Sequence, residues 1–180
     1  MNLSLKPAGR QDMKKIKRLY LVAFPPEERA PFGFIRRRAG KRADMLAAFD
    51  KEEFIGFAYT VTHEDMAYLF YFAICEDKRG MGYGSAILER LIEIYSGKRF
   101  FLAREQLDSS AENYTQRINR HSFYLHNGLI DLPGHITEAG VIYDVMGIGG
   151  EVSPADYDGL ITPWSGKFIK KRADMRLFID

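Results

Sequence analysis

The chain has 180 residues, of which 46% are hydrophobic and 28% are charged, close to the usage of an ordinary globular domain. This composition excludes a disordered tail, a coiled coil and a collagen-like fibre, and the length predicts a single domain over residues 1–180. The net charge of +2 comes from 26 basic and 24 acidic residues, and it gives no whole-chain reason to expect nucleic acid as the main partner.

A single cysteine, Cys75, excludes an internal disulfide framework and a multi-cysteine zinc site. The start of the chain is polar and lacks the apolar core of a signal peptide. No apolar run approaches the roughly 18 residues that would suggest a membrane span. We therefore expect a soluble, cytoplasmic protein with no metal and no membrane partner.

The first predicted helix covers residues 11–24, where apolar residues recur at helical spacing and Asp12 stands near the start as a cap. Pro25 and Pro26 end this helix. The basic run at residues 36–42 favours a solvated helix face, with contact to an acidic substrate or to a coenzyme phosphate as alternatives.

Three strand-like segments follow. Residues 44–49 read as a strand, and residues 53–62 are rich in aromatic and branched side chains, as strands are. Residues 66–75 are almost wholly apolar, which is typical of a central strand covered on both faces. Only short turns separate the three segments, so we expect an antiparallel meander.

The second half of the chain alternates helices and strands. Helical periodicity returns at residues 84–96, and Gly97 suits the position after a helix end. We expect the glycine- and proline-rich stretch up to Gly166 to be a long loop or a hairpin connection, and residues 167–180 to form a strand or a helix. The order predicts a mixed α/β sheet with helices packed on it. The remaining predicted elements are a buried strand at 100–103, a helix at 112–127 and a strand at 141–148.

The segment with the most chemical information lies between the apolar strand and the following helix. Gly80, Gly82 and Gly84 alternate there, and glycine permits positive φ and a close approach of main-chain amides to a ligand. Amides at a helix N-terminus, with the helix dipole behind them, form an anion site. Arg79 adds a guanidinium suited to phosphate. The pattern therefore predicts a pyrophosphate site.

Two common nucleotide-binding loops fit this segment poorly. A Walker loop would end in Gly-Lys-Ser/Thr, which the segment lacks. A Rossmann loop needs G-x-G-x-x-G after the first strand of a parallel sheet, whereas these glycines alternate and follow the predicted antiparallel meander.

The segment instead resembles the acyl-coenzyme A signature of the GNAT N-acetyltransferase superfamily, Gln/Arg-x-x-Gly-x-Gly/Ala. The resemblance covers residues 44–128 well and the two ends poorly. It implies a GNAT-like mixed, largely antiparallel sheet flanked by helices. It also implies that the loop amides hold the pyrophosphate of acetyl-CoA, while the preceding strand pairs with the pantetheine arm. The residues implied to bind coenzyme A are Phe72, Ala73, Ile74, Arg79, Gly80, Met81, Gly82, Tyr83, Gly84 and Ser85.

A second similarity lies at residues 122–129, which resemble the family's Tyr-x-x-x-Gly-Phe. It implies that Tyr124 returns a proton to the departing thiolate. A thiol has a pKa of about 8.5 and a tyrosine about 10, so a positioned phenol can do this at little cost. Packing on an apolar helix face is the alternative role for Tyr124. Many family members place an asparagine seven residues earlier, where this chain has Arg117.

A general base would assist the reaction, because an amine such as lysine has a pKa of about 10.4 and is mostly protonated at neutral pH. By family resemblance, Glu105 at the end of the 100–103 strand is the best-placed candidate. Glu28, with its neighbour Glu27, is the rival, because the loop after the first helix borders the acceptor pocket in the family. Each of these residues also fits a solvated surface acid.

These features predict an N-acetyltransferase that passes an acetyl group from acetyl-CoA directly to an amine on a small molecule or peptide. A non-catalytic acyl-CoA-binding regulator is one alternative. The other is a nucleic-acid-binding module that uses residues 36–42 and 167–176, and the near-neutral total charge counts against it. The tail could supply an added or exchanged edge strand to a second copy, which leaves a homodimer open.

Overall fold

Strand β4 (Met66–Ile74) contributes to two compact units in the computed structural model, which describes residues 1–179. Unit 1 holds residues 1–62 and 69–96, and unit 2 holds residues 63–68 and the chain from residue 97 onward. The residues of β4 up to Tyr68 therefore belong to unit 2, and those from Leu69 belong to unit 1.

The sheet of unit 1 consists of β1 (Leu3–Pro7), β2 (Ala43–Asp50), β3 (Glu53–His63) and the second part of β4. The pairs β1–β2 and β2–β3 are antiparallel. A Cβ on Gly56 of β3 would lie 2.3 Å from the carbonyl oxygen of Ala73 in β4. The close approach of these two strands therefore requires glycine at position 56.

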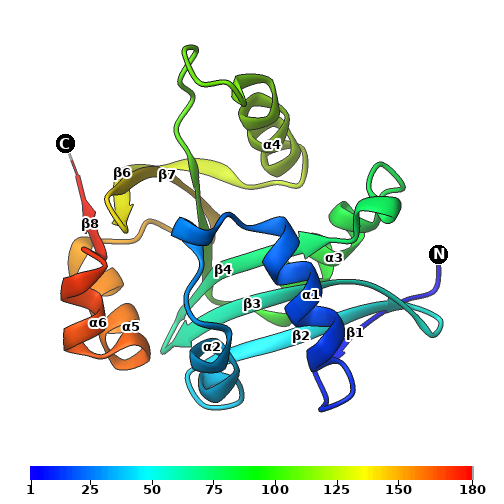
Figure 1. Ribbon diagram of the computed structural model, residues 1–180. Coiled ribbons are helices and arrows are strands. Elements are labelled where there is room, and N and C mark those ends of the chain that lie inside the picture. The colour runs from blue at the N-terminus through cyan, green and yellow to red at the C-terminus, as the bar shows by residue number, and fades with distance from the viewer. Residues whose placement is uncertain (180) are drawn as a thin grey trace. The chain divides into compact units, whose positions relative to one another are not determined.

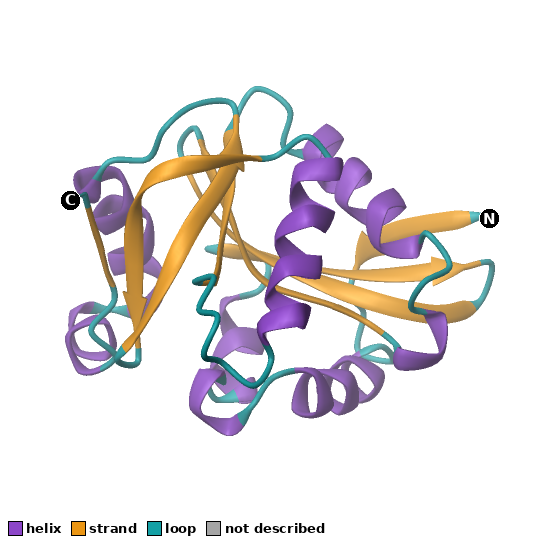
Figure 2. Cartoon of the chain, turned by 90° about the horizontal axis from the view of Figure 1, so that it is seen from above, coloured by secondary structure: helices purple, strands orange, loops and turns teal. Residues whose placement is uncertain are grey.

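Two helices cover the face of this sheet that carries Tyr59, and a third covers the opposite face (Figures 1 and 2). The Tyr59 hydroxyl donates to the carbonyl of Ile35 at 3.1 Å, which places α2 (Phe32–Arg38) on that face together with α1 (Met13–Ala23). α3 (Tyr83–Ile94) lies on the other face, where Tyr95 donates to Asp44 at 2.9 Å. Short 3₁₀ turns, η1 (Pro26–Glu28) and η2 (Glu76–Lys78), precede α2 and α3.

The sheet of unit 2 begins where the first residues of β4 pair in parallel with β5 (Arg99–Glu105). This pairing runs from Met66↔Arg99 to Tyr68↔Phe101. The other pairs of unit 2 are antiparallel and join β5 to β7 (Val141–Ile148), β7 to β6 (Ile130–Glu138) and β6 to β8 (Arg176–Phe178). The complete strand order is β1-β2-β3-β4-β5-β7-β6-β8.

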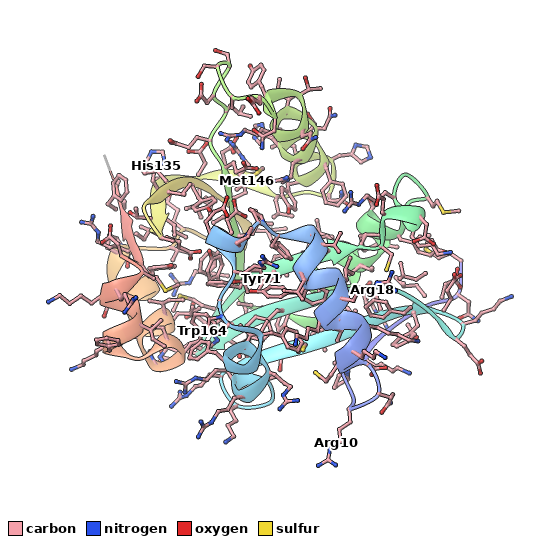
Figure 3. The ribbon with its side chains drawn as sticks, in the orientation of Figure 1. Arg10, Arg18, Tyr71, His135, Met146 and Trp164 are labelled. Atoms are coloured by element: carbon pink, nitrogen blue, oxygen red, sulfur yellow. The ribbon has the colours of Figure 1, made fainter. Side chains whose placement is uncertain are left out.

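The helices of unit 2 are α4 (Tyr114–His126), α5 (Pro154–Ser165) and α6 (Lys167–Arg172). α5 packs on the sheet through Tyr157, whose hydroxyl donates to Glu138 Oε1 at 2.9 Å. The Tyr68 hydroxyl donates to the same oxygen at 2.9 Å, and the Tyr68 ring stacks on Phe101 with centroids 4.8 Å apart. The buried Trp164 lies near the end of α5 (Figure 3).

Most of the predicted elements are confirmed, with shifts of a few residues at their ends. The predicted long loop up to Gly166 is wrong, because its last part is the helix α5. The tail contains both a helix, α6, and a strand, β8, rather than one of the two. β1 and β6 were not predicted, and β6 contains Pro133 and Gly134, which weaken the sequence pattern of a strand.

Candidate functional site

The predicted pyrophosphate loop lies in unit 1 between η2 and α3. Gly80 and Gly82 have φ values of +75° and +83°, a region that side-chain-bearing residues rarely adopt. Gly82 is the N-cap of α3, and because it has no side chain, the first amides of this helix have no side-chain cap. The first turn of the helix contains no acidic residue. The local geometry is therefore that of a helix start without an anionic cap of its own.

The amides of this loop are available to a ligand. The first amides of a helix have no partner within the helix, and among residues 1–179 no acceptor takes the amides of residues 80–85. A Cβ on Gly80 would meet no protein atom within 4 Å, and one on Gly82 would meet only the Cε of Met1 at 3.8 Å. Open space therefore lies beside the loop, as the predicted coenzyme site requires.

The main chain of β4 leads directly into this loop. β4 pairs with β5 only through residues 66–68, so the pairing ends before Phe72, Ala73 and Ile74. Within unit 1, Ala73 lies against β3 at Gly56. One edge of the second part of β4 thus keeps main-chain donors and acceptors that an extended ligand can use.

Two buried tyrosines fix the loop that carries Glu28. Tyr71 of β4 donates its hydroxyl to the Glu28 carbonyl at 3.1 Å and accepts the amide of Ala30 at 3.0 Å. Tyr20 of α1 donates to the Ala30 carbonyl at 2.8 Å, and its ring meets Tyr71 edge-on with centroids 4.9 Å apart. Burial raises the pKa of Tyr20 to about 12, so the phenol remains a donor. The sequence analysis missed both tyrosines, although a hydroxyl on a buried apolar element usually has a partner.

Tyr124 lies near the end of α4 in unit 2 and is 9% exposed. Burial raises the pKa of its phenol above the ordinary value, and the charge of Arg120 offsets part of that rise. Its hydroxyl makes no hydrogen bond within the described part of the chain. Tyr124 is therefore a protonated, uncommitted donor at neutral pH, as a general acid must be.

Glu105, at the end of β5, is held by several groups from the α4 region. It accepts a hydrogen bond from Asn113 Nδ2 at 3.0 Å and forms ion pairs with Arg117 at 3.2 Å and Arg120 at 2.5 Å. Burial opposes ionisation, but the Asn113 hydrogen bond and the two guanidinium groups outweigh it and hold the pKa of Glu105 below its ordinary value. Arg117, which stands where the family often has asparagine, is thus a partner of Glu105.

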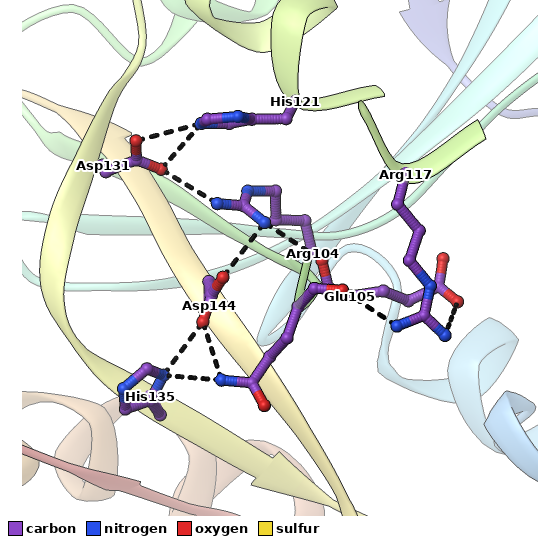
Figure 4. A network of polar contacts seen from close by, with 8 residues as sticks. Arg104, Glu105, Arg117, His121, Asp131, His135 and Asp144 are labelled. Atoms are coloured by element: carbon purple, nitrogen blue, oxygen red, sulfur yellow. Dashed lines mark hydrogen bonds and ion pairs between the residues drawn. The ribbon is translucent and has the colours of Figure 1, made fainter. Parts of the chain in front are cut away.

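A second polar network ties α4 to the sheet of unit 2 (Figure 4). The buried guanidinium of Arg104 contacts Asp131 at 3.2 Å and Asp144 at 3.0 Å. Each carboxylate also contacts a histidine: Asp131 lies 2.9 Å from His121 of α4, and Asp144 lies 3.0 Å from His135 of β6. The network sets the position of the helix that carries Tyr124.

The predicted site residues thus fall into two groups. Unit 1 contains the coenzyme-loop residues, the second part of β4 and Glu28, whose loop is anchored to β4 by Tyr71. Unit 2 contains Tyr124 and Glu105, which are linked through Arg120. Cys75 is half-buried and its Sγ lies 3.7 Å from the carbonyl of Phe54. Among the residues described, no group of three or more His, Cys, Asp or Glu side chains is arranged to hold a metal ion, and no helix is long and apolar enough to cross a membrane.

Comparison with known proteins identifies the class to which this fold belongs. The model of the acetyltransferase (GNAT) family matches residues 13–119. A search of curated protein sequences finds no match. The chain therefore belongs to the GNAT acetyltransferase family, and its mixed, mostly antiparallel sheet with flanking helices is the GNAT fold, as the sequence predicts.

Solved structures share this fold at low sequence identity. A GNAT-family protein from Bacteroides thetaiotaomicron has a TM-score of 0.70 and 23% identity, over 92% of this chain and 98% of its own. The ribosomal-protein-S18-alanine N-acetyltransferase of Escherichia coli has a TM-score of 0.63 and 18% identity, over 84% and 96%. Arabidopsis thaliana Naa50, in complex with the bisubstrate analogue CoA-Ac-MVNAL, has a TM-score of 0.63 and 14% identity, over 83% and 100%.

Proposed function

We propose that this protein is an N-acetyltransferase that transfers the acetyl group of acetyl-CoA directly to an amine of a small molecule or peptide. Family membership supports the transferase class. The observation that carries the proposal is the loop at residues 80–85, in which uncommitted amides stand at the uncapped start of α3. Similar folds bind coenzyme A or its derivatives, as in the Arabidopsis thaliana Naa50 complex.

In this proposal, unit 1 binds the acyl donor. The amides of residues 80–85 and the guanidinium of Arg79 hold the pyrophosphate, where the dipole of α3 adds to the attraction. The main chain of Phe72, Ala73 and Ile74 pairs with the pantetheine arm as an added strand would. A main-chain amide that polarises the thioester carbonyl, together with correct orientation of the two substrates, supplies much of the rate acceleration.

Proton transfer is assigned to side chains. A carboxylate takes a proton from the acceptor ammonium group, the free amine attacks the thioester carbon, and the carbon–sulfur bond breaks. Tyr124 then donates its proton to the departing thiolate, and the second proton that the nitrogen loses as the amide forms restores the phenol. Of the two candidate bases we favour Glu28, whose loop is anchored to β4 by Tyr71, because Glu105 is held by Arg117, Arg120 and Asn113. A carboxylate with a lowered pKa is also the weaker base.

The proposal is tested by calorimetric titration of the protein with acetyl-CoA, followed by detection of free thiol with a panel of amines. We expect the wild type to bind with a dissociation constant on the order of micromolar. Gly82→Glu should abolish binding by adding a carboxylate beside the pyrophosphate. Because Gly82 has a positive φ, Ser85→Glu provides a second variant that repels phosphate without backbone strain.

Ser96→Glu is the matched control, since it adds the same charge at an exposed position beyond the other end of α3. It should bind acetyl-CoA like the wild type. The proposal is overturned if the folded wild-type protein does not bind acetyl-CoA, or if Ser85→Glu and Ser96→Glu bind it equally well.

A further inference from the structure

The positive charge of this chain is concentrated in its first quarter. Residues 6–42 contain twelve of the 26 lysines and arginines but only three of the 24 acidic residues, which is a net charge of +9. The remaining residues carry a net charge of −7, so the total of +2 is the sum of two oppositely charged parts. A charge this uneven creates a local electrostatic field that the total conceals.

Most of these cations are exposed and have no anionic partner. None of the ten exposed lysines and arginines in residues 6–42 forms an ion pair with any residue of the described chain. By contrast, the basic tail is partly neutralised, because Lys170 pairs with Asp158 and Arg176 pairs with Asp174. The exposed cations, here called the basic face, are Lys6, Arg10, Lys14, Lys15, Lys17, Arg18, Arg36, Arg37, Lys41 and Arg42.

The fold of unit 1 gathers these cations. Lys14, Lys17 and Arg18 follow the i, i+3, i+4 spacing that places residues on one face of a helix. Arg10, which precedes α1, and Arg36 of α2 line the same surface pocket of about 500 Å³, together with Ala8 and Met13. Arg10, beside the start of α1, and Arg36 of α2 therefore lie on the same part of the surface.

A lysine of β1 and a lysine of α1 lie over the same aromatic ring. Lys6 of β1 and Lys15 of α1 both lie over the ring of Phe49, with Nζ 4.4 Å and 5.9 Å from the ring centroid. The ring stabilises two neighbouring ammonium groups without neutralising either of them. The basic face thus extends from the edge strand across α1 to α2.

We propose that the basic face binds the phosphate backbone of a nucleic acid, independently of sequence. A helix of eleven residues spans about 16 Å, a length over which a nucleic acid strand presents several phosphates. α1 carries four exposed cations over its length. The guanidinium groups at the Arg10–Arg36 pocket suit bidentate contact with phosphate oxygens.

Two other polyanions match the basic face less well. A membrane surface usually also receives apolar side chains, but Ile16, Leu19 and Tyr20 of α1 are buried. The exposed apolar residues of α1, Leu21 and Val22, lie only at its end. An acidic peptide would need a nearly unbroken run of carboxylates to reach the charge density of a nucleic acid strand.

The test measures binding of the full chain to a labelled oligouridine of about 20 nucleotides by fluorescence anisotropy. For about six phosphate contacts, the affinity for a single strand should fall by between two and three orders of magnitude, about 300-fold, between about 50 and 200 mM salt. The double variants Lys14→Glu/Arg18→Glu and Arg36→Glu/Arg37→Glu should each bind at least about tenfold more weakly and show a shallower salt dependence.

Lys171→Glu/Arg172→Glu is the matched control, because it makes the same change in net charge at two exposed residues of α6. It should bind RNA within about twofold of the wild type. Equal losses in the control and in the α1 and α2 variants would overturn the proposal, as would no RNA binding at the lower salt concentration. Tighter binding to phosphatidylserine vesicles or to polyglutamate would overturn it in favour of that partner.

Calorimetry with acetyl-CoA separates this proposal from the proposed enzymatic function. The α1 and α2 variants should bind acetyl-CoA like the wild type, since the coenzyme loop is built from other residues. Loss of acetyl-CoA binding in these variants would assign the basic face to the coenzyme and overturn the nucleic-acid proposal. RNA binding that persists in Ser85→Glu would show that the basic face works without the coenzyme site.

Discussion

Glu28 and Glu105, the two candidate bases, are held in place in different ways. Glu105 faces two arginines and an asparagine, and its side chain is 16% exposed. These contacts favour the ionised form and hold its pKa down. The loop of Glu28 is instead fixed through main-chain groups, its own carbonyl and the two polar groups of Ala30. The main chain of this loop therefore sets the position of Glu28.

This contrast predicts different effects of the two glutamine substitutions. Glu105→Gln should cost about 1–2 kcal/mol in the free energy of unfolding, because it removes the charge that the half-buried Arg117 and the exposed Arg120 face. Glu28→Gln should lower kcat by about a hundredfold, because an amide cannot take a proton from the acceptor. Urea denaturation and steady-state kinetics on both variants check this. A kcat loss confined to Glu105→Gln would assign the base to Glu105.

The substitution Tyr124→Phe tests the hydroxyl of Tyr124 alone, because it removes the hydroxyl and keeps the ring. The ring packing is kept, and the hydroxyl has no hydrogen-bond partner in the described chain, so stability should stay within about 0.5 kcal/mol. kcat should fall by about a hundredfold, with little change in KM for acetyl-CoA. Tyr114→Phe, in the first turn of the same helix, should have wild-type kinetics. If Tyr124→Phe has the kcat of the wild type, Tyr124 is not the general acid and serves only in packing.

At the scale of elements, α5 shows how local capping overcomes an unfavourable composition. It contains Gly159 and Pro163, yet it begins with a capping box in which Ser153 and Asp156 satisfy each other's main-chain amides. Arg99 of β5 then holds Asp156 at 2.7 Å. These contacts stabilise a helix that composition alone suggests is a loop.

Ser153→Ala should therefore lower the free energy of unfolding by about 1 kcal/mol, the usual contribution of an N-cap side chain. Ser96→Ala is the control, since Ser96 is exposed and caps no helix start, and it should change stability by less than about 0.5 kcal/mol. The measurement is urea denaturation followed by circular dichroism. Equal effects of the two substitutions would contradict a role for the capping box.

The same contacts give α5 a pH dependence. Hydrogen bonds from Arg99 and from Ser153 hold the pKa of Asp156 well below its ordinary value. In the pH range between the folded and unfolded pKa values, the folded state binds fewer protons, so stability falls as pH decreases below about 4. Asp156→Asn should therefore lose less stability than the wild type between neutral pH and pH of about 3. A parallel decline in both proteins would contradict this assignment.

The elements that sequence patterns predicted are those whose signal is local. β4 is almost wholly apolar, and α3 has a clear apolar stripe that ends before Gly97. β6 and α5 escaped prediction because Pro133, Gly134 and Pro163 interrupt their patterns, while pairing with β7 and the capping box compensate. The ion pairs of Glu105 were also beyond reach, since they depend on how α4 folds back onto β5.

At the scale of the whole molecule, the total charge conceals how the charged residues are distributed along the chain. The total charge of +2 argues against a nucleic-acid partner, yet residues 6–42 alone carry +9. The same distribution is visible in the printed sequence, but only the fold shows that Arg10 and Arg36 share a pocket and that Lys6 and Lys15 share the ring of Phe49. It also shows that the basic face forms no ion pair within residues 1–179.

β4 contributes residues to both units, which predicts that the units unfold together. Residues 66–68 pair with β5 in unit 2, and the rest of β4 belongs to the sheet of unit 1. Trp164, the only tryptophan, is buried in α5 and reports on unit 2. Phe57→Ala, in the core of unit 1, should cost about 3–5 kcal/mol.

If β4 transmits this loss, the urea midpoint followed by Trp164 fluorescence should shift with the midpoint followed by circular dichroism. Phe101→Ala, a core substitution in unit 2 beside Tyr68, is the matched comparison and should shift both signals in the same way. A Trp164 transition that stays in place in Phe57→Ala, while circular dichroism shows earlier unfolding, would mean that the units unfold independently. Strand sharing through β4 would then be too weak to couple them.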